Sequence, residues 1–435
     1  ELGAGERTGL PENLHALCQE SARQALVGLG DDAITTLQLA AILGREVDAD
    51  ELERACQQVS VRLRRDVLDR LESAHLLVPT DGGWIFGHAI LQESIERTAE
   101  ERGKLPALHR ACADALMASA PARGVARRRA LHLVHAGAEV EAIDVLWDAA
   151  EEYSQSSEFS AARDVLERRE AIMERCKLGA KDVRWGKGWL AAAEVLRAQW
   201  QFDQADELAR RALEAAVTHG WDDVRAQATA TLAQVSRQRG DLDAATSQVR
   251  QALALFERVG DAKGLGSCLL VSAMVARQQG NADRAAEFYE RARKLFAGLG
   301  DRTGEAHCLL GLGHVCRQRQ ERERGAELYA EASKLYRDLG NQSGLAHCVN
   351  GLAELARFAG NDEAAERGYR EALAIHEAIG SKAAFISRLN LGLVLASRRK
   401  YADARLEFGV VVAQLTDTGQ DGYLGIAHTC LMTCA

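Results

Sequence analysis

Proline, long apolar runs and an N-terminal leader pattern are all scarce or missing in this sequence. Only four prolines occur in 435 residues, whereas Ala, Leu, Arg and Glu dominate, which is the composition of a nearly all-helical protein. No apolar stretch approaches the roughly 20 residues that span a membrane. The first five residues have neither the basic start nor the apolar run of a signal peptide. We therefore expect a cytoplasmic, all-α protein that does not cross a membrane.

The motifs that mark many enzymes and metal proteins are absent as well. The chain has no GxxxxGK[ST] phosphate loop, no GxSxG and no HExxH. Its ten cysteines include no CxxC pair, so we interpret them as reduced thiols that pack as small apolar residues. His307-Cys308 and His347-Cys348 do recur, but a pair repeated at a 40-residue interval is better explained by packing than by a metal. We predict no catalytic residue, no metal and no cofactor.

The balance of charge is acidic and limits the class of partner. Charged residues make up 27% of the chain and hydrophobic residues 47%, as in a globular protein. The formal net charge of −9 argues against non-specific nucleic-acid binding, which requires a basic surface. A length of 435 residues exceeds one ordinary core and favours two or three domains or a repeat array.

A 40-residue repeat is the strongest signal in the sequence. Glycines recur at this interval in the second half of the chain, and a second turn lies midway in each unit. Glycine favours the end of a helix because the left-handed conformation found there costs it little. Each unit is therefore predicted to be a pair of helices. The recurring glycines are Gly220, Gly260, Gly300, Gly340, Gly380 and, one residue early, Gly419; the midway turns are Gly240-Asp241, Gly280-Asn281, Gln320-Glu321 and Gly360-Asn361.

Side chains of similar size recur in phase with these glycines. Small residues stand on the first helix of each unit and again on the second helix, where they let two helices approach closely. A larger residue follows four positions after the second small residue, and this spacing places both on one buried stripe. The small residues are Ala233, Ala273, Gly313, Ala353 and Gly392 on first helices and Ala205, Ala245, Ala285, Gly325, Ala365 and Ala404 on second helices; the larger ones are Val249, Tyr289, Tyr329, Tyr369 and Phe408.

This pattern resembles the tetratricopeptide repeat in its longer form. The resemblance covers residues 181–435, with weaker helix pairs back to about Val125. It implies a right-handed solenoid of helical hairpins whose first helices line a concave groove. The large aromatic residue usual early in the first helix is missing, which marks a divergent repeat; Thr229, Leu269, Leu309 and Val349 stand there.

Residues 11 to about 120 carry no repeat. Their periodicity predicts helices over 11–28, 31–43, 48–57, 61–74, 88–101 and 103–119. Two short apolar runs within residues 76–86 flank Asp81-Gly82-Gly83, which indicates one small β-hairpin. Helices followed by a hairpin predict a winged-helix-like domain over residues 1–120.

Three stretches of this domain, at residues 40–46, 68–77 and 86–93, resemble the winged helix that follows the nucleotide-binding core in large signal-transduction ATPases. That family includes bacterial activators of the maltose-regulator type and ATPase modules attached to serine/threonine kinases or nucleotide cyclases. Its winged helix leads into helix pairs like the one at residues 131–137 and then into a superhelical sensor arm. The resemblance implies domains at 1–120, 121–180 and 181–435, with an ATPase core upstream of Glu1.

Two features of the N-terminal domain are candidates for a function. The resemblance implies that His88 contacts the nucleotide bound to the upstream core, with Gly87 standing where the family commonly has a basic residue. A histidine satisfied at a domain junction is the alternative. The predicted helix 61–74 could read DNA in a major groove. Its basic residues alternate with acidic ones, which is more typical of a solvated face, so we do not expect DNA as a partner; they are Arg62, Arg64, Arg65 and Arg70, with Asp66, Asp69 and Glu72.

An arginine column runs through the repeats. Arg237, Arg277, Arg317 and Arg357 are 40 residues apart, near the end of each first helix. In tetratricopeptide proteins this position faces the groove, where stacked guanidinium groups suit carboxylates or phosphates. Two structural alternatives stay open: the helix macrodipole favours a cation in the last turn by about 0.3–1 kcal/mol, and arginine also pairs with acidic residues of a neighbouring unit. The other expected groove residues are Gln238, Gln278, Gln318, His314, Asn350 and Glu354.

The sequence thus favours a non-catalytic interaction or sensor scaffold. The resemblance implies the regulatory arm of a larger signalling ATPase or kinase. Its groove would hold a protein or peptide, either an acidic segment or the upstream domain of its own chain. A small-molecule effector sensor and a DNA-binding regulator are the alternatives. An open charged groove favours the first reading, whereas a closed apolar pocket with a few polar groups favours a metabolite.

Overall fold

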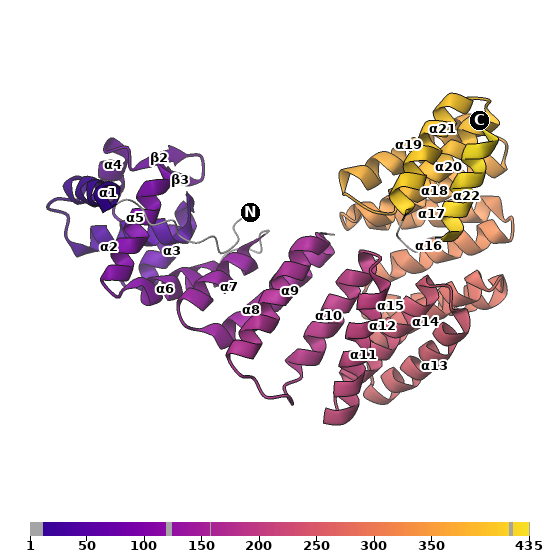
Figure 1. The fold of residues 1–435 in the computed structure, drawn as a ribbon, viewed down its shortest axis with the longest axis horizontal. Helices are drawn as coiled ribbons and strands as arrows, with labels where there is room; N and C mark the ends of the chain where they lie inside the picture. Colours follow the sequence, from indigo (N-terminus) through magenta and orange to yellow (C-terminus); the bar gives the residue numbers. More distant parts are fainter. Residues whose placement is uncertain (1–11, 119–123, 157, 417–420, 435) are drawn as a thin grey trace. The chain divides into compact units, whose positions relative to one another are not determined.

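The computed structural model describes residues 12–118, 124–156, 158–416 and 421–434. Gly419 of the predicted glycine series therefore lies outside the described residues. The chain divides into two compact units, residues 1–180 and 181–435, and each is described by itself. Helices α1 to α22 and three short strands make up the two units (Figure 1). Within the described ranges, no helix is both long and apolar enough to cross a membrane.

The first unit begins with helices packed around one core. Leu39, Leu52 and Leu71 are fully buried at its centre. Two of the expected helices are shorter than predicted. Residues 61–64 are extended, since Arg64 has φ −109° and ψ 132°, and the first helix ends in a turn after Ala25. The helices are α1 (Glu12–Ala25), α2 (Asp31–Leu43), α3 (Ala49–Gln58), α4 (Arg65–Ser73), α5 (Ala89–Glu101) and α6 (Leu105–Met117).

The predicted hairpin is part of a three-stranded antiparallel sheet with the order β1-β3-β2. Strands β2 (Leu77–Thr80) and β3 (Gly83–Phe86) form the hairpin, and β1 (Glu46–Asp48) pairs with the other edge of β3. The predicted hairpin is present, and the additional strand β1 was missed because it has three residues, too few for an alternating pattern. Gly83 allows the close approach of β1, since a Cβ built there would lie 2.0 Å from the Val47 carbonyl oxygen. The winged-helix interpretation of this region stays a prediction.

An ion pair joins the next helices to this core. In α7 (Val125–His135), the two terminal nitrogens of Arg128 donate to the Glu51 carboxylate at 3.0 and 2.7 Å. One of them also donates to the Leu43 carbonyl at 3.2 Å. Glu51 is only 7% exposed, so loss of its partner would leave a buried, unpaired charge. The chain continues into α8 (Glu139–Gln155) and α9 (Phe159–Arg175), which close the first unit.

The second unit is a tetratricopeptide-type solenoid, which confirms the predicted fold class. Its helices succeed one another as antiparallel pairs followed by one further helix (Figure 1). The pairs are α10 (Arg184–Ala198) with α11 (Phe202–His219), α12 (Asp222–Gln238) with α13 (Leu242–Val259), α14 (Ala262–Gln278) with α15 (Ala282–Leu299), α16 (Arg302–Gln318) with α17 (Arg322–Asp338), α18 (Gln342–Phe358) with α19 (Asp362–Ala378) and α20 (Ala384–Ser397) with α21 (Tyr401–Leu415); α22 spans Asp421–Thr433.

Short polar side chains start the central helices at 20-residue intervals. Each accepts a hydrogen bond from the backbone N–H three residues further on and so satisfies one donor of the first turn. At three of the six midway turns a glycine takes the left-handed conformation, and at the other three Trp200, Gln320 and Arg399 adopt it with φ of 63°, 63° and 61°. The capping residues are Asp241, Asp261, Asn281, Asp301, Asn341 and Asn361.

Glycines on the first helices make room for buried tyrosine rings. A Cβ built at Gly311 would lie 2.2 Å from the ring of Tyr289, and one at Gly351 would lie 2.6 Å from the ring of Tyr329. Both tyrosines are at most 1% exposed. Each ring therefore fixes how the second helix of one unit sits against the first helix of the next.

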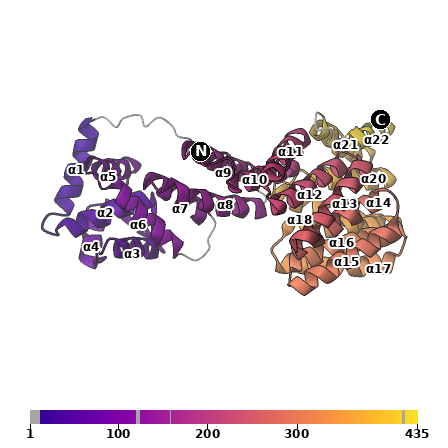
Figure 2. The same ribbon diagram turned by 90° about the horizontal axis from the view of Figure 1, so that it is seen from below.

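The first helices lie on the inner side of the solenoid and the second helices on the outer side. Contacts run between successive first helices, from α10 to α12 and onward to α20, while contacts between successive second helices are at most marginal. Helices on the inner side of a curved array are closer together, so this pattern identifies the concave face. In Figures 1 and 2 the helices of residues 181–435 curve around in the same order.

The array turns far enough for its first pair to meet its sixth. The Lys382 Nζ donates to the Gln199 carbonyl at 2.9 Å, across 183 residues of sequence. The ring of Trp200, in the turn between α10 and α11, meets the ring of Phe385 in α20 edge to face, with 5.2 Å between centroids. The 40-residue pattern carries no sign of this contact, because it joins elements five units apart.

Candidate functional site

The predicted arginine column lies in the last turns of α12, α14, α16 and α18. All four side chains are half-buried, and each Nε is buried without a hydrogen-bond partner among the described atoms. A fifth member, Arg197, stands 40 residues before Arg237 at the end of α10. It was missed because the glycine series begins only at Gly220; counting back one period finds it.

Arg197 is held by residues on two first helices. It forms an ion pair with Glu194 at 2.7 Å, and its Nη1 donates to Gln238 Oε1 at 3.2 Å. Glu194 also accepts a hydrogen bond from Thr231 at 2.9 Å. Arg197 therefore bridges α10 and α12 on the concave side, and its charge is compensated within the protein.

Arg317, three units further on, is compensated by a carboxylate of the next first helix. Its Nη1 forms an ion pair with Glu354 of α18 at 3.1 Å, with side-chain exposures of 24% and 17%. The neighbouring His314 shares a hydrogen bond of 2.8 Å between its Nδ1 and the Tyr329 hydroxyl. Burial and the charges of Arg277 and Arg317 hold the pKa of His314 well below its usual range, so the imidazole is neutral.

Arg237 and Arg277 differ from these two. Among the residues that the structure describes, neither has a carboxylate partner. Burial, together with the charges of Arg197 and Arg277, lowers the pKa of Arg237 to about 10. Burial raises the pKa of Tyr289, and the charge of the adjacent Arg277 opposes this shift. Two arginines without carboxylates thus lie next to each other in the middle of the inner face.

Some of the remaining predicted groove residues bond within the protein, and others are exposed. Asn350 accepts a hydrogen bond from Ser387 of α20 at 3.2 Å, so it links two first helices. Arg357 lies over the ring of Phe358, with 4.5 Å to the centroid. Gln278 and Gln318 are exposed at the ends of α14 and α16. The structure therefore gives Asn350, Glu354 and Gln238 bonding partners within the protein and leaves the two glutamines accessible.

His88 is exposed at the start of α5 and forms no side-chain cap there. The adjacent Gly87 has a structural reason to lack a side chain. A Cβ built at Gly87 would lie 2.6 Å from the His75 carbonyl oxygen, and its N–H donates to the Leu76 carbonyl at 3.1 Å. A basic residue like that of the resembled family does not fit at Gly87 without a shift of this turn.

Helix α4 corresponds to the helix that was considered for DNA readout, and two basic residues at its start are paired with acids. Arg64 pairs with Asp66, and Arg65 pairs with Asp69 at 3.0 Å. Glu72 accepts a hydrogen bond from the indole of Trp84 at 2.9 Å. The surface of α4 is therefore mixed in charge, which disfavours contact with a polyanion.

The recurring histidines pack against aromatic residues. His307 lies 5.7 Å from the ring of Tyr336, and His347 lies 5.0 Å from the ring of His376. Within the described ranges, no three His, Cys, Asp or Glu side chains are placed to hold a metal ion together. Cys308 and Cys348 are fully buried, and burial raises the pKa of both thiols to about 12.

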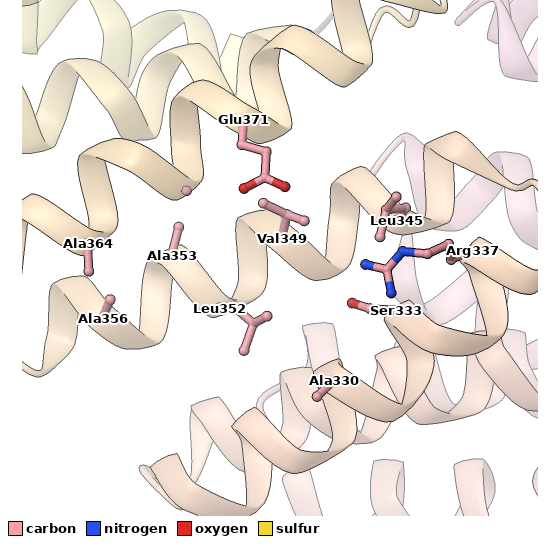
Figure 3. Close-up of a pocket in the computed structure, with 11 residues that line it drawn as sticks. Ala330, Ser333, Arg337, Leu345, Val349, Leu352, Ala353, Ala356, Ala364 and Glu371 are labelled. Carbon is pink, nitrogen blue, oxygen red and sulfur yellow. The ribbon is translucent and has the colours of Figure 1, made fainter.

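A pocket of about 490 Å³ lies between the outer helices α17 and α19, with α18 as its floor (Figure 3). The floor is apolar, with Val349 and Leu352 among its residues, and the exposed Arg337 and Glu371 are its charged members. Gly368 lines this space and also lets α18 and α19 approach closely, since a Cβ built there would lie 2.7 Å from the Ala353 Cβ. Earlier second helices carry a larger residue at this position; these are Gln248, Phe288 and Leu328. The pocket contains no member of the arginine column.

Comparison with known proteins supports the repeat class. The family model of the soluble NSF attachment protein (SNAP) matches residues 260–391, which is less than half of the chain. No curated protein matches the sequence.

Two solved structures share the fold at low sequence identity. One is a Signal Transduction ATPase with Numerous Domains (STAND) protein with a tetratricopeptide repeat sensor from Pyrococcus horikoshii; the TM-score is 0.63 and the identity 14%, over 99% of this chain and 66% of that chain. The other is a Rap protein complexed with Competence and Sporulation Factor, with a TM-score of 0.55 and 13% identity over 75% of this chain and 96% of that chain. The present chain spans just under two thirds of the STAND protein. It is thus a tetratricopeptide-type solenoid, similar in fold to a STAND protein along nearly its whole length.

Proposed function

We propose that this chain is a non-catalytic, cytoplasmic interaction and sensor arm of a larger signalling ATPase or kinase. Its inner face, over residues 181–435, holds a protein or peptide and relays that binding to a core upstream of Glu1 through a winged-helix-like domain over residues 1–120. The single observation that carries the proposal is the arginine column on the inner face, in which Arg237, Arg277 and Arg357 have no carboxylate partner among the described residues.

The compared structures support this reading by analogy. The STAND protein is described as having a tetratricopeptide repeat sensor, and the Rap protein is complexed with Competence and Sporulation Factor. Both share this fold at 13–14% identity, which speaks to fold and not to partner. The mixed charge of α4 favours a protein partner over DNA.

Site-specific photo-crosslinking in cells that carry the full-length parent tests the proposal. A photoreactive amino acid replaces Gln278 or Gln318, which are exposed at the inner ends of α14 and α16. The matched control replaces Gln251, an exposed glutamine on the outer helix α13. We expect one protein, or an upstream segment of the same chain, to crosslink from both inner positions and not from Gln251. Equal crosslinking from Gln251, or none from either inner position, would refute the proposal.

A further inference from the structure

The five inner arginines are not equivalent. Three residues before each of them, on the same face of the helix, stands a residue that can reach the guanidinium group. Before Arg197 this residue is Glu194, and its carboxylate is bound by that arginine. Glu354 occupies the same position on α18 and is bound by Arg317 of α16. The two carboxylates thus neutralise one arginine on either side of the middle of the column.

The middle of the column lacks this compensation. The residue three positions before Arg237 is Gln234, and the one before Arg277 is Met274. The third such residue, His314, is neutral and hydrogen-bonded to Tyr329. No carboxylate therefore replaces the missing glutamates on these helices.

Burial makes this arrangement costly. Removing a guanidinium group from water without a counter-charge is unfavourable, and a second cation nearby adds to the cost. Arg237 is affected by both Arg197 and Arg277, and its depressed pKa has these causes. The Nε of Arg237 and that of Arg277, like those of Arg317 and Arg357, are also buried donors without an acceptor in the described structure. Each arginine thus keeps an unused hydrogen-bond donor as well as an unused charge.

Two purely structural explanations of the column, the helix macrodipole and pairing with an acid, do not explain why some of its arginines lack a carboxylate partner. The helix macrodipole acts on all five arginines alike, since each lies in the last turn of its helix. Pairing with an acid explains Arg197 and Arg317 but leaves Arg237, Arg277 and Arg357 without one among the described residues. Of these three, only Arg357 has a glutamate, Glu354, three residues before it on its own helix. Tyr289 lies beside Arg277 but brings no negative charge to it, since burial raises the pKa of the phenol.

We propose that Arg237 and Arg277 together bind one oxyanion, a carboxylate or a phosphate group carried by an extended peptide on the inner face. The two guanidinium groups supply several N–H donors to a single anion, a geometry that arginine offers to carboxylates and phosphates. Glu194 and Glu354 repel an anion at the flanking arginines and so confine the site to the middle. The peptide context rests on the proposed function, whereas the anion site itself does not.

Four single variants of the 435-residue chain test the assignment through stability. Methionine replaces each arginine in turn, because it keeps the length and helix propensity of the side chain without its charge. We expect R237M and R277M to raise the denaturation midpoint, since each removes a buried, uncompensated cation. We expect R197M and R317M to lower it, since Glu194 or Glu354 loses its partner. If R237M and R277M destabilise the chain as much as R317M does, these arginines are structural and the proposal fails.

Anion binding to the same variants is the second arm. The probes are inorganic phosphate at constant ionic strength, an oligoglutamate peptide, and a glutamine peptide with and without one phosphoserine. We expect binding to the native chain and to R317M, and a loss of roughly ten- to a hundredfold in R237M and R277M. Preference for oligoglutamate or for the phosphoserine peptide distinguishes a carboxylate from a phosphate. The anion site is refuted if R237M binds the probes as tightly as the native chain, or if the native chain binds none of them. Neither outcome bears on the crosslinking experiment.

Discussion

Replacement of Tyr336 by phenylalanine should stabilise this protein. The position belongs to a column on the second helices that reads Phe256, Phe296, Tyr336 and His376 in successive units. The ring of Tyr336 is fully buried, and among the described atoms its hydroxyl has no hydrogen-bond partner. A buried polar group without a partner costs about 1–3 kcal/mol, whereas the ring itself fits a site that two earlier units fill with phenylalanine.

The matched control is Tyr329 to phenylalanine. Tyr329 is equally buried and lies in the same helix, α17, but its hydroxyl is hydrogen-bonded to His314 Nδ1 at 2.8 Å. Removing that hydroxyl deletes a hydrogen bond and leaves a buried imidazole nitrogen without its partner. The two variants make the same chemical change about two turns apart on one buried face of the helix, so their difference reports on the hydrogen bond.

We expect a gain of about 1–2 kcal/mol for Tyr336 to phenylalanine and a loss of about 1–2 kcal/mol for Tyr329 to phenylalanine. For a unit of this size, each kcal/mol moves the melting temperature by roughly 2–4 °C. Circular dichroism at 222 nm during urea and thermal unfolding measures both quantities. If the Tyr336 variant is destabilised as much as the Tyr329 variant, the Tyr336 hydroxyl has a partner and the reasoning is wrong.

Three further predictions concern pH, closure and packing. Burial lowers the pKa of His376 from 6.5 to about 4, so protonation favours the unfolded chain. The contribution of His376 to the free energy of unfolding is therefore complete above pH 6.5 and is lost between pH 6.5 and 4, by at most about 3 kcal/mol. Urea unfolding at several pH values should show a weaker pH dependence in His376 to phenylalanine. Trp200 to alanine removes the contact with Phe385 and should enlarge the radius of gyration in small-angle X-ray scattering; an unchanged radius would contradict closure by this contact. Gly351 to alanine should destabilise by about 1–3 kcal/mol, because its Cβ meets Tyr329. Gly298 to alanine, in the last turn of α15 where a Cβ meets nothing, should gain up to about 1 kcal/mol in the same unfolding assay; a gain at both would contradict the tight packing.

The solenoid was predictable because its information is local and repeated. A glycine series and two packing columns stay in phase over five units, and each unit contacts mainly its neighbours. The capping residues could have been added from the same pattern, since Asp241, Asp261 and Asn281 begin a series at 20-residue intervals. The period of the sequence therefore fixes both the number of helices and their order.

Features that join distant parts of the chain could not be predicted in this way. Strand β1 has three residues and is specified by its pairing with β3, not by any pattern of its own. The contact of Trp200 with Phe385 depends on the curvature accumulated over five units, which no single unit encodes. Both are consequences of the folded shape and become visible only in three dimensions.

The arginine column lies between these two cases. Its period is visible in the sequence, but the period alone treats every member alike. The distinction between compensated and uncompensated arginines depends on Glu354 reaching back to Arg317 across two helices. Glu194, by contrast, binds the arginine of its own helix, three residues away. The sequence thus supplies the candidates, and the side-chain geometry decides which of them are free to bind.

Two kinds of polar group in this solenoid lack a hydrogen-bond or charge partner in the described structure. Their locations, in the packed core or on the inner face, decide whether a ligand can reach them. Tyr336 and His376 are at most 1% exposed within the packed core, so no ligand reaches them and their replacement by phenylalanine should change stability alone. Arg237 and Arg277 are half-buried on the inner face, where a partner can approach. Their replacement should raise stability and abolish anion binding together. A stabilising substitution that removes binding is the signature of a group retained for function, and on this physical ground the middle of the inner face is assigned as the site.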